Sequence, residues 1–177
     1  MWNPILYQKA IDFAATAHKD QLVKGKTYQY VVHLSNVAAE VARAMFEEKP
    51  KNPDLLIQWS LLHDVLEDTE TTEESVEKIF GTEVLNGIKA LTKNPNLNKE
   101  DQINDSLEKI LNSNKEVAWV KLADRITNLQ EPPPNWDKEK IKKYLEDAKK
   151  IYSKLNTFNK YLGQRLKDCI EDYKKYI

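Results

Sequence analysis

Three short polar insertions interrupt otherwise apolar segments of the chain, and their side chains are of the kinds that bind metal ions. They are His33, the adjacent pair His63-Asp64, and Asp124. Burying an unpaired charge costs several kcal/mol, so a carboxylate in an apolar segment needs a partner. Two imidazoles and two carboxylates form the usual ligand set for a divalent ion such as manganese, iron or zinc. The pattern therefore indicates a site for one divalent metal ion.

Two further carboxylates follow the His-Asp pair at helical spacing. Glu67 lies four residues after His63, and Asp68 lies four residues after Asp64. On a helix, each would stack one turn beyond its predecessor. This arrangement predicts a second layer of acidic groups that could orient a water molecule or accept its proton.

Each of these features also has a purely structural interpretation. A lone buried histidine is more often a satisfied core residue than a ligand, and Asp124 could form an ion pair with Arg125. Glu67 and Asp68 could belong to a solvated or capping run. Taken together these interpretations are disfavoured, because four ligand-type residues would have to fall by chance in three helical contexts. A further histidine, His18, is interpreted as structural.

The elements that position these residues are predicted to be helices joined by short loops. Only four glycines are present, and few left-handed turns are therefore expected. Asn3-Pro4 and Asn52-Pro53 are helix start signals, and Thr71 with Glu74 forms a capping box for a short helix that Gly81 can end. The predicted helices cover about 4–18, 33–46, 53–63, 72–80, 83–91, 99–111, 117–129 and 137–170. Residues 20–32 form a predicted loop, and the last helix is expected to break near 156–159 or at Gly163.

Composition limits the function classes. The 27 basic and 28 acidic residues nearly cancel, so there is no electrostatic case for a nucleic-acid or membrane partner. Cys169 is the single cysteine, which excludes an internal disulfide. We expect no signal peptide and no membrane span, and the expected compartment is a reducing cytoplasm. Residues 1–177 are expected to form one domain, with the last helix, from about 137, packing on the core.

The metal-ligand pattern resembles the HD superfamily of metal-dependent phosphohydrolases. Longer strings are more specific: LLHDVLEDTETTEESVEKIFGTEV, from Leu61, and VKLADRITNL, from Val120, resemble the hydrolase domain of the RelA/SpoT alarmone enzymes. The similarity extends to their stand-alone small relatives, a group that includes the metazoan SpoT homologue, and covers roughly residues 5–155.

The resemblance implies an all-α, single-domain helical bundle of about eight to ten helices with one metal ion, most often manganese. It also implies hydrolytic removal of the 3′-pyrophosphate from guanosine 3′,5′-bis(diphosphate), or a related alarmone. By this match His33, His63, Asp64 and Asp124 are the metal ligands, Glu67 and Asp68 are the catalytic carboxylates, and the substrate-binding residues are Lys24, Asn128 and Tyr144.

Several positions depart from the family pattern where it recognises the substrate. Val23 stands in place of an arginine that stacks on guanine, and Gln29 replaces a proline. Leu34 follows the first metal histidine where the family has proline, and Glu131 replaces a threonine near the base or ribose. The metal and catalytic positions are intact, so these departures predict hydrolysis with altered recognition of the base.

Two other functions stay open at this point. One is the same chemistry on another phosphorylated nucleotide, such as a nicotinamide dinucleotide phosphate or a deoxynucleotide. The other is a non-catalytic module that binds a nucleotide. Glu67 and Asp68 argue against the latter, because a binding module does not need them. The expected partner is a small-molecule nucleotide, and the sequence leaves the oligomeric state open.

Overall fold

The computed structural model describes the backbone of residues 1–177 and all side chains except those of Lys99 and Glu100. Its regular secondary structure is helical, and within this described chain the one β-type pairing is an isolated antiparallel bridge between Leu22 and Gln29. The predicted all-α class and the predicted range of helix number are confirmed. The helices are α1 (Pro4–Ala17), α2 (Val31–Glu47), α3 (Pro53–Leu62), α4 (Val65–Asp68), α5 (Glu73–Phe80), α6 (Thr82–Leu91), α7 (Lys99–Leu111), α8 (Val117–Asn128), α9 (Lys138–Leu155) and α10 (Lys160–Tyr173), followed by a 3₁₀ turn, η1 (Lys174–Tyr176).

Short polar side chains begin most of these helices, as their sequence predicts. Asn3 and Asn52 each accept a backbone N–H through the side chain, and a proline occupies the first helical position after each. The long C-terminal pattern breaks after Leu155, where Asn159 caps α10. Gly163 does not break the helix but lies inside α10, so the second of the two predicted break points is wrong.

Two predicted helix starts are shifted. Helix α2 begins at Val31 rather than His33, because the backbone N–H of His33 already donates to the carbonyl of Tyr30. Helix α5 is capped by Thr72, whose hydroxyl oxygen accepts from Ser75 N at 3.2 Å. The predicted cap, Thr71, is instead bonded to the Thr69 hydroxyl at 2.7 Å.

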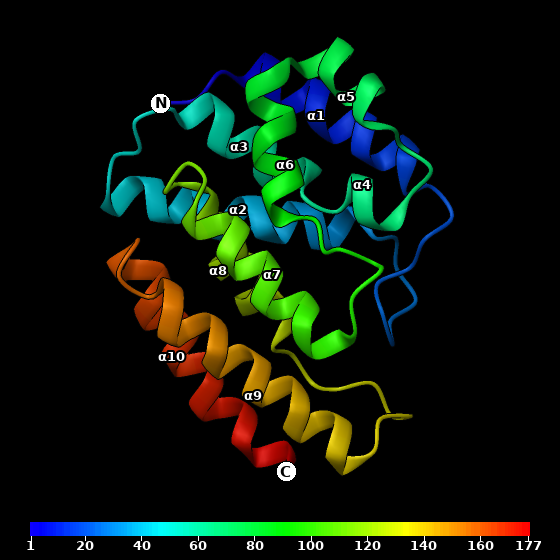
Figure 1. Ribbon diagram of the computed structural model, residues 1–177, viewed down its shortest axis with the longest axis vertical. Coiled ribbons are helices and arrows are strands. Elements are labelled where there is room, and N and C mark those ends of the chain that lie inside the picture. Colours follow the sequence, from blue (N-terminus) through cyan, green and yellow to red (C-terminus); the bar gives the residue numbers. More distant parts are fainter.

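Helix α3 lies at the centre of the N-terminal part of the fold (Figure 1). It packs against α1, α2, α6 and α8, and its residues from Leu56 to Leu62 are all buried. Its apolar character on every side follows from this position. The His63-Asp64 pair comes directly after α3, so the core fixes its location.

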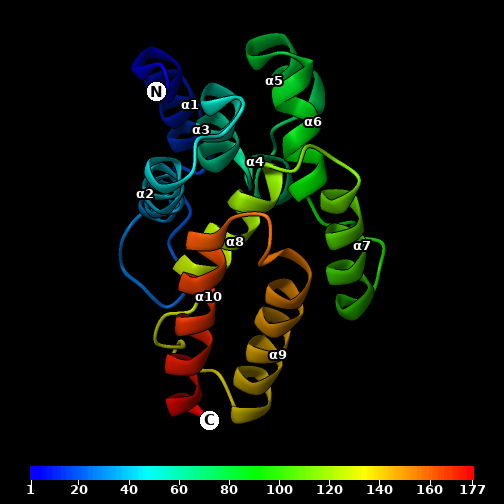
Figure 2. The ribbon, with the colours of Figure 1, turned by 90° about the vertical axis from the view of Figure 1, so that its left-hand side faces the viewer.

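Helix α8 joins the two halves of the molecule. Figure 2 shows α8 between the α1–α3 group and the α9–α10 hairpin, and it packs against α2, α3, α9 and α10. Residues Val117–Ile126 of α8 are all buried. Asp124 and Lys121 therefore lie in the interior of the fold.

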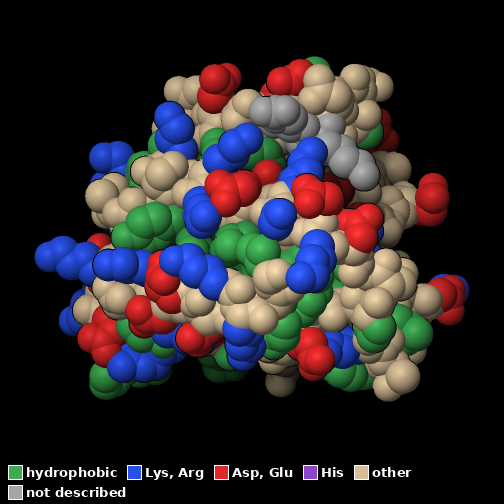
Figure 3. All heavy atoms as spheres, turned by 90° about the horizontal axis from the view of Figure 1, so that it is seen from below, with side chains coloured by type: hydrophobic (Ala, Val, Ile, Leu, Met, Phe, Trp, Pro, Cys, Tyr) green, Lys and Arg blue, Asp and Glu red, His purple; other side chains and the backbone are tan. Residues whose placement is uncertain are grey.

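The surface carries both signs of charge. On the face shown in Figure 3, basic and acidic side chains are interspersed around an apolar centre, in agreement with a formal net charge of −1. Among the described residues, no helix combines the length and the apolar character that crossing a membrane requires.

Candidate active site

The four residues predicted to bind a metal converge at one place. His33 lies in the first turn of α2, His63 and Asp64 form the junction of α3 and α4, and Asp124 lies in α8. His33 Nε2 is 3.8 Å from Asp64 Oδ2 and 3.4 Å from Asp124 Oδ1. His63 Nε2 is 2.9 Å and 3.7 Å from the same two oxygens. In the described part of the chain, donor atoms of His33, His63 and Asp64 all lie within 4.8 Å of one another, a spacing that can hold a metal ion.

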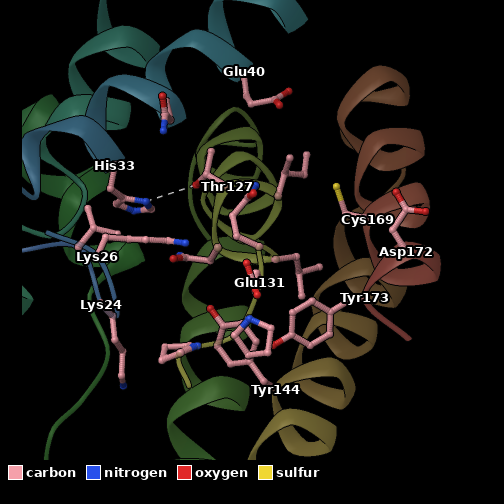
Figure 4. A pocket seen from close by; sticks show the side chains of 18 of the residues that line it. Lys24, Lys26, His33, Glu40, Thr127, Glu131, Tyr144, Cys169, Asp172 and Tyr173 are labelled. Carbon is pink, nitrogen blue, oxygen red and sulfur yellow. Dashed lines mark hydrogen bonds between the residues drawn. The ribbon is translucent and has the colours of Figure 1, made fainter. Parts of the chain in front are cut away.

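The hydrogen bonds of the two imidazoles fit a cation at this centre. His63 Nδ1 is 2.9 Å from the carbonyl oxygen of Ser60, so Nδ1 carries the proton. Thr127 Oγ1 donates to the Asp124 carbonyl, which leaves a lone pair for His33 Nδ1 at 3.4 Å (Figure 4). Both Nε2 lone pairs then point toward carboxylate oxygens, and both atoms are buried without a hydrogen-bond partner. Lone pairs facing carboxylates need a positive charge between them, and a divalent metal ion supplies it.

The charges around His63 also indicate that this centre needs a cation. Burial would lower the pKa of His63, but the carboxylates of Asp64 and Asp124 outweigh it and raise that pKa to about 10. With no other cation, a proton on His63 would hold the cluster together. A metal ion can replace that proton, because metal binding needs a neutral imidazole.

Asp124 is held by two neighbours on its own helix. Lys121 Nζ lies 3.0 Å from Oδ2, and Asn128 Nδ2 donates to Oδ1 at 2.5 Å. Burial opposes ionisation, but Lys121 and the two histidines keep the pKa of Asp124 well below its usual value. The ion pair with Arg125 considered from the sequence is replaced by this Lys121 contact. Arg125 instead stacks on the Tyr144 ring at 4.5 Å.

Asp64 has a partner from the loop that precedes α2. The Tyr30 hydroxyl donates to Asp64 Oδ2 at 2.5 Å, and the Tyr30 ring lies 5.1 Å from the ring of His33. Burial opposes ionisation of Asp64, but His63 outweighs it and lowers the pKa of Asp64 below its usual range. Burial and the Asp64 charge together raise the pKa of Tyr30, so this hydroxyl keeps its proton and donates.

The two predicted catalytic carboxylates lie in α4, on the turn after the metal cluster. Glu67 is held by Lys93, whose Nζ is 2.6 Å from Oε1 and whose backbone N–H donates to Oε2 at 3.0 Å. Asp68 is more open to solvent, and Gln21 Nε2 donates to its Oδ2 at 3.5 Å. Partial burial and the charges of Asp64 and Glu67 raise the pKa of Asp68. A carboxylate with a raised pKa beside a metal site is suited to proton transfer.

A cavity of about 910 Å³ opens beside these residues, and Figure 4 shows part of its lining. Of the residues proposed to act in the chemistry, His33 and Asp68 line this cavity. The predicted substrate residues Lys24, Asn128 and Tyr144 all line it, as do Val23 and Glu131, where the chain departs from the family pattern. The walls are formed by the 21–30 loop, the 129–136 segment and helices α9 and α10.

Sequence reasoning missed several residues of the site. Tyr30, Lys93 and Lys121 contact Asp64, Glu67 and Asp124 respectively. Trp136 lines the cavity with the Lys24 ammonium 5.1 Å from its ring centroid and the Tyr144 ring 5.0 Å away. The Lys121 contact could have been predicted, because Lys121 lies three residues before Asp124 on the same helix face. The other contacts join distant segments.

Comparison with known proteins agrees with the fold. The family model described as "HD domain" matches residues 10–159. The chain therefore belongs to the HD-domain family.

A mouse relative, guanosine-3′,5′-bis(diphosphate) 3′-pyrophosphohydrolase MESH1, is 31% identical over 169 residues, covering 93% of this chain and 92% of the mouse protein. The solved structure described as a metazoan orthologue of SpoT that hydrolyses ppGpp has a TM-score of 0.84 and 27% identity, covering 97% of both chains. A Listeria monocytogenes structure has a TM-score of 0.67 at 22% identity, covers 82% of this chain and 96% of its own, and supports the fold alone.

Proposed function

We propose that this protein is a metal-dependent hydrolase that removes the 3′-pyrophosphate from guanosine 3′,5′-bis(diphosphate) or a closely related alarmone. The observation that carries the proposal is the pair of buried Nε2 atoms of His33 and His63, which face Asp64 and Asp124 without a hydrogen-bond partner. The names of the mouse relative and of the metazoan SpoT orthologue support the choice of substrate.

In this proposal His33, His63, Asp64 and Asp124 hold one divalent ion, with manganese as the preferred metal. A bound divalent ion acts as a Lewis acid that lowers the pKa of water and offsets negative charge on a phosphoryl group. A non-catalytic binding module would not need the two extra carboxylates of Glu67 and Asp68, so the enzymatic role is favoured.

The remaining chemistry falls to side chains of the cavity. Glu67, fixed by two donors from Lys93, orients the attacking water. Asp68 accepts a proton from this water, because the raised pKa of Asp68 suits proton transfer. The water oxygen forms a bond to phosphorus, the bond from phosphorus to the 3′ oxygen breaks, and that oxygen receives a proton. Lys24 and Lys26 place positive charge along the cavity, where the phosphates would lie.

The substrate base is a finer part of the proposal. A planar arginine can stack on a purine and donate hydrogen bonds, whereas Val23 offers only a weaker apolar contact. We infer a raised KM and a relaxed choice of base, with an intact chemical step. We propose further that residues 1–177 act as one unit, in the cytoplasm, on a small molecule. The single cysteine and the near-zero net charge support this setting.

A nucleotide panel tests the proposal. Purified protein is incubated with Mn²⁺ and guanosine 3′,5′-bis(diphosphate), its adenosine counterpart, a nicotinamide dinucleotide phosphate and a deoxynucleoside triphosphate, and products are separated by chromatography. Release of pyrophosphate from the guanosine substrate is expected. Preferred turnover of another nucleotide would replace the substrate assignment, and no turnover with any of them would contradict the enzymatic role.

Val23→Arg tests the base assignment separately. The variant should lower KM for the guanosine substrate and leave kcat within a few-fold, because the metal and carboxylates act on the phosphoryl group. Lys26→Arg is the matched control, since it adds a guanidinium at a nearby cavity position. Tight, guanine-selective turnover by the wild type that Val23→Arg does not improve would show that the base is recognised elsewhere.

A further inference from the structure

His18 contacts two residues that in turn contact the candidate active site, Gln21 and Tyr30. Its side chain is 3% exposed, and Nδ1 is 2.6 Å from the side-chain oxygen of Gln21. That oxygen can only accept a hydrogen bond, so Nδ1 of His18 must carry the proton. His18 is the C-cap residue of α1, and its carbonyl accepts from Gln21 N, which fixes the relative positions of the two residues.

This contact fixes the orientation of the Gln21 amide. With Oε1 occupied by His18, the amide nitrogen of Gln21 points to Asp68, and Nε2 donates to Oδ2 at 3.5 Å. The opposite orientation would place the amide oxygen against the Asp68 carboxylate, and two oxygens that only accept cannot form a hydrogen bond. Hydrogen bonds of this length in free enzymes often tighten when the substrate is bound.

The ring of His18 supports a second contact. It stacks on Tyr30 with ring centroids 4.8 Å apart and planes 29° apart, and the Tyr30 hydroxyl donates to Asp64. The backbone N–H of Tyr30 donates to the Gln21 carbonyl at 2.8 Å, so His18, Gln21 and Tyr30 form one bonded group. This group contacts two acidic residues of the site, Asp64 and Asp68.

We propose that His18 is a positioning residue: through the Gln21 amide it orients the Asp68 carboxylate for proton transfer. This inference rests on the proposed function, which gives Asp68 its role in the chemical step. It replaces the purely structural role that the sequence suggested for His18. A structural histidine would affect the stability of the α1 end, whereas a positioning residue affects kcat at unchanged metal content.

Two substitutions of His18 separate its ring from its donor. His18→Phe keeps a flat ring against Tyr30 and removes the Nδ1 donor, whereas His18→Asn loses the ring but keeps an N–H donor near the same place. Gln21→Leu removes the amide, and Lys19→Met, an exposed neighbour, is the control. We expect His18→Phe and Gln21→Leu to lower kcat by roughly 10- to 100-fold, the usual effect of losing an orienting partner. His18→Asn should recover part of this loss, and Lys19→Met should behave as wild type.

The double variant gives the decisive kinetic result. If His18 acts through Gln21, then His18→Phe should have no further effect on kcat in the Gln21→Leu background. Multiplying effects would overturn the inference, as would an unchanged kcat in His18→Phe. If His18→Phe does not fold, the same comparison is made with His18→Asn, whose kcat should exceed that of Gln21→Leu.

A measurement on the substrate-free protein distinguishes this inference from the proposed function. In ¹⁵N-labelled protein the side-chain amide resonance of Gln21, assigned by its loss in Gln21→Leu, should shift in both His18→Phe and Asp68→Asn but not in Lys19→Met. These shifts in a protein that hydrolyses none of the nucleotides would contradict the proposed function and leave the contact intact. Normal hydrolysis with a Gln21 resonance that responds to neither change would overturn the positioning role alone.

Discussion

In His33 and His63, the hydrogen bond made by Nδ1 determines whether Nε2 is free to bind a metal ion. The partner of His63 Nδ1 is the Ser60 carbonyl, one turn earlier on the same helix, and the partner of His33 Nδ1 is the Thr127 hydroxyl from α8. Both partners accept a hydrogen bond from Nδ1–H. Since a neutral imidazole with Nδ1 protonated binds metals through Nε2, the protein has already selected the required tautomers.

Asp64 is a better position than Asp124 for testing metal dependence. Asp64→Ala should abolish metal retention and turnover with little change in helical content, because it leaves the buried Lys121–Asp124 pair intact. Metal content after dialysis, the circular dichroism spectrum and the rate of hydrolysis are the measurements. Full turnover by Asp64→Ala, or by wild type in excess chelator, would exclude a metal-dependent mechanism.

Asp124→Ala should remove the metal as well, but with an added loss of stability. It leaves the Lys121 ammonium buried without its carboxylate, which typically costs about 3–5 kcal/mol. The double variant Asp124→Ala, Lys121→Met removes the unpaired charge. Its unfolding free energy from urea titration should be higher than that of Asp124→Ala, and its metal binding should remain absent. Equal stability of the single and double variants would mean that Lys121 finds another partner.

Glu67 is expected to act in the chemical step and not in metal binding. Glu67→Gln keeps the shape of the side chain but removes its charge and one of the two oxygens that accept from Lys93. Because the water is then less well oriented for proton transfer to Asp68, kcat should fall by roughly 10²- to 10⁴-fold, the range of general acid–base catalysis. Metal content should stay at the wild-type level. Glu70→Gln, an exposed carboxylate nearby, serves as the control and should leave kcat unchanged. Loss of metal in Glu67→Gln would make Glu67 a ligand.

The chemical core of the site could be predicted because its residues contrast with their own surroundings. His33, His63, Asp64 and Asp124 are polar residues in apolar segments, and that contrast is visible locally. The contacts of Tyr30 and Lys93 could not be found in this way. Each depends on a partner 34 or 26 residues away, and no local pattern records that distance.

At the scale of helices, start signals were the most reliable feature because they act within one turn. Asn3 and Asn52 cap through bonds to residues two or three positions ahead. The Thr71 prediction failed because Thr69 competes for the same hydroxyl. The choice among neighbouring threonines depends on the path of the preceding loop, which a capping pattern does not contain.

Helix α6 contains a glycine whose role is packing. A Cβ atom on Gly87 would lie 2.1 Å from Trp59 Nε1, and that indole nitrogen donates to the Val84 carbonyl at 3.1 Å. The close approach of α6 to α3 therefore needs a residue without a side chain.

Gly87→Ala should destabilise the protein although alanine favours helix. The propensity gain is about 1 kcal/mol, whereas overpacking against the buried Trp59 costs roughly 1–3 kcal/mol and weakens its hydrogen bond. Asn86→Ala, on the exposed face of the same helix, is the control and should be neutral or stabilising. Thermal unfolding of the two variants provides the comparison. A higher melting temperature for Gly87→Ala would mean that Trp59 moves without cost.

At the scale of the whole molecule, the proposed metal site joins segments from distant parts of the chain. Its residues come from α2, the α3–α4 junction and α8, and α8 in turn packs against α9 and α10. A ligand that binds only when these segments are assembled stabilises the entire fold.

Metal binding should therefore raise the melting temperature. At a Mn²⁺ concentration of about 100 times Kd, binding contributes about 2.7 kcal/mol, which for a chain of this size corresponds to roughly 5–10 °C. Calorimetry of the metal-free protein with and without Mn²⁺ measures the shift, and Asp64→Ala should show none. An equal shift in Asp64→Ala would indicate that the ion binds elsewhere.

The candidate reactive groups and much of the cavity lining come from different parts of the fold. The candidate reactive groups lie on α2, the α3–α4 segment and α8, whereas much of the lining comes from the 21–30 loop, the 129–136 segment and α9–α10. Substitutions at lining positions that contact none of these groups, such as Val23 and Glu131, can therefore accumulate without disturbing the reaction. Residues that select the nucleotide are thus separate from residues that perform hydrolysis. Evolution can then change which nucleotides are accepted while the hydrolytic reaction is kept. Val23 and Glu131, both in the cavity lining, are the positions where we expect such changes first.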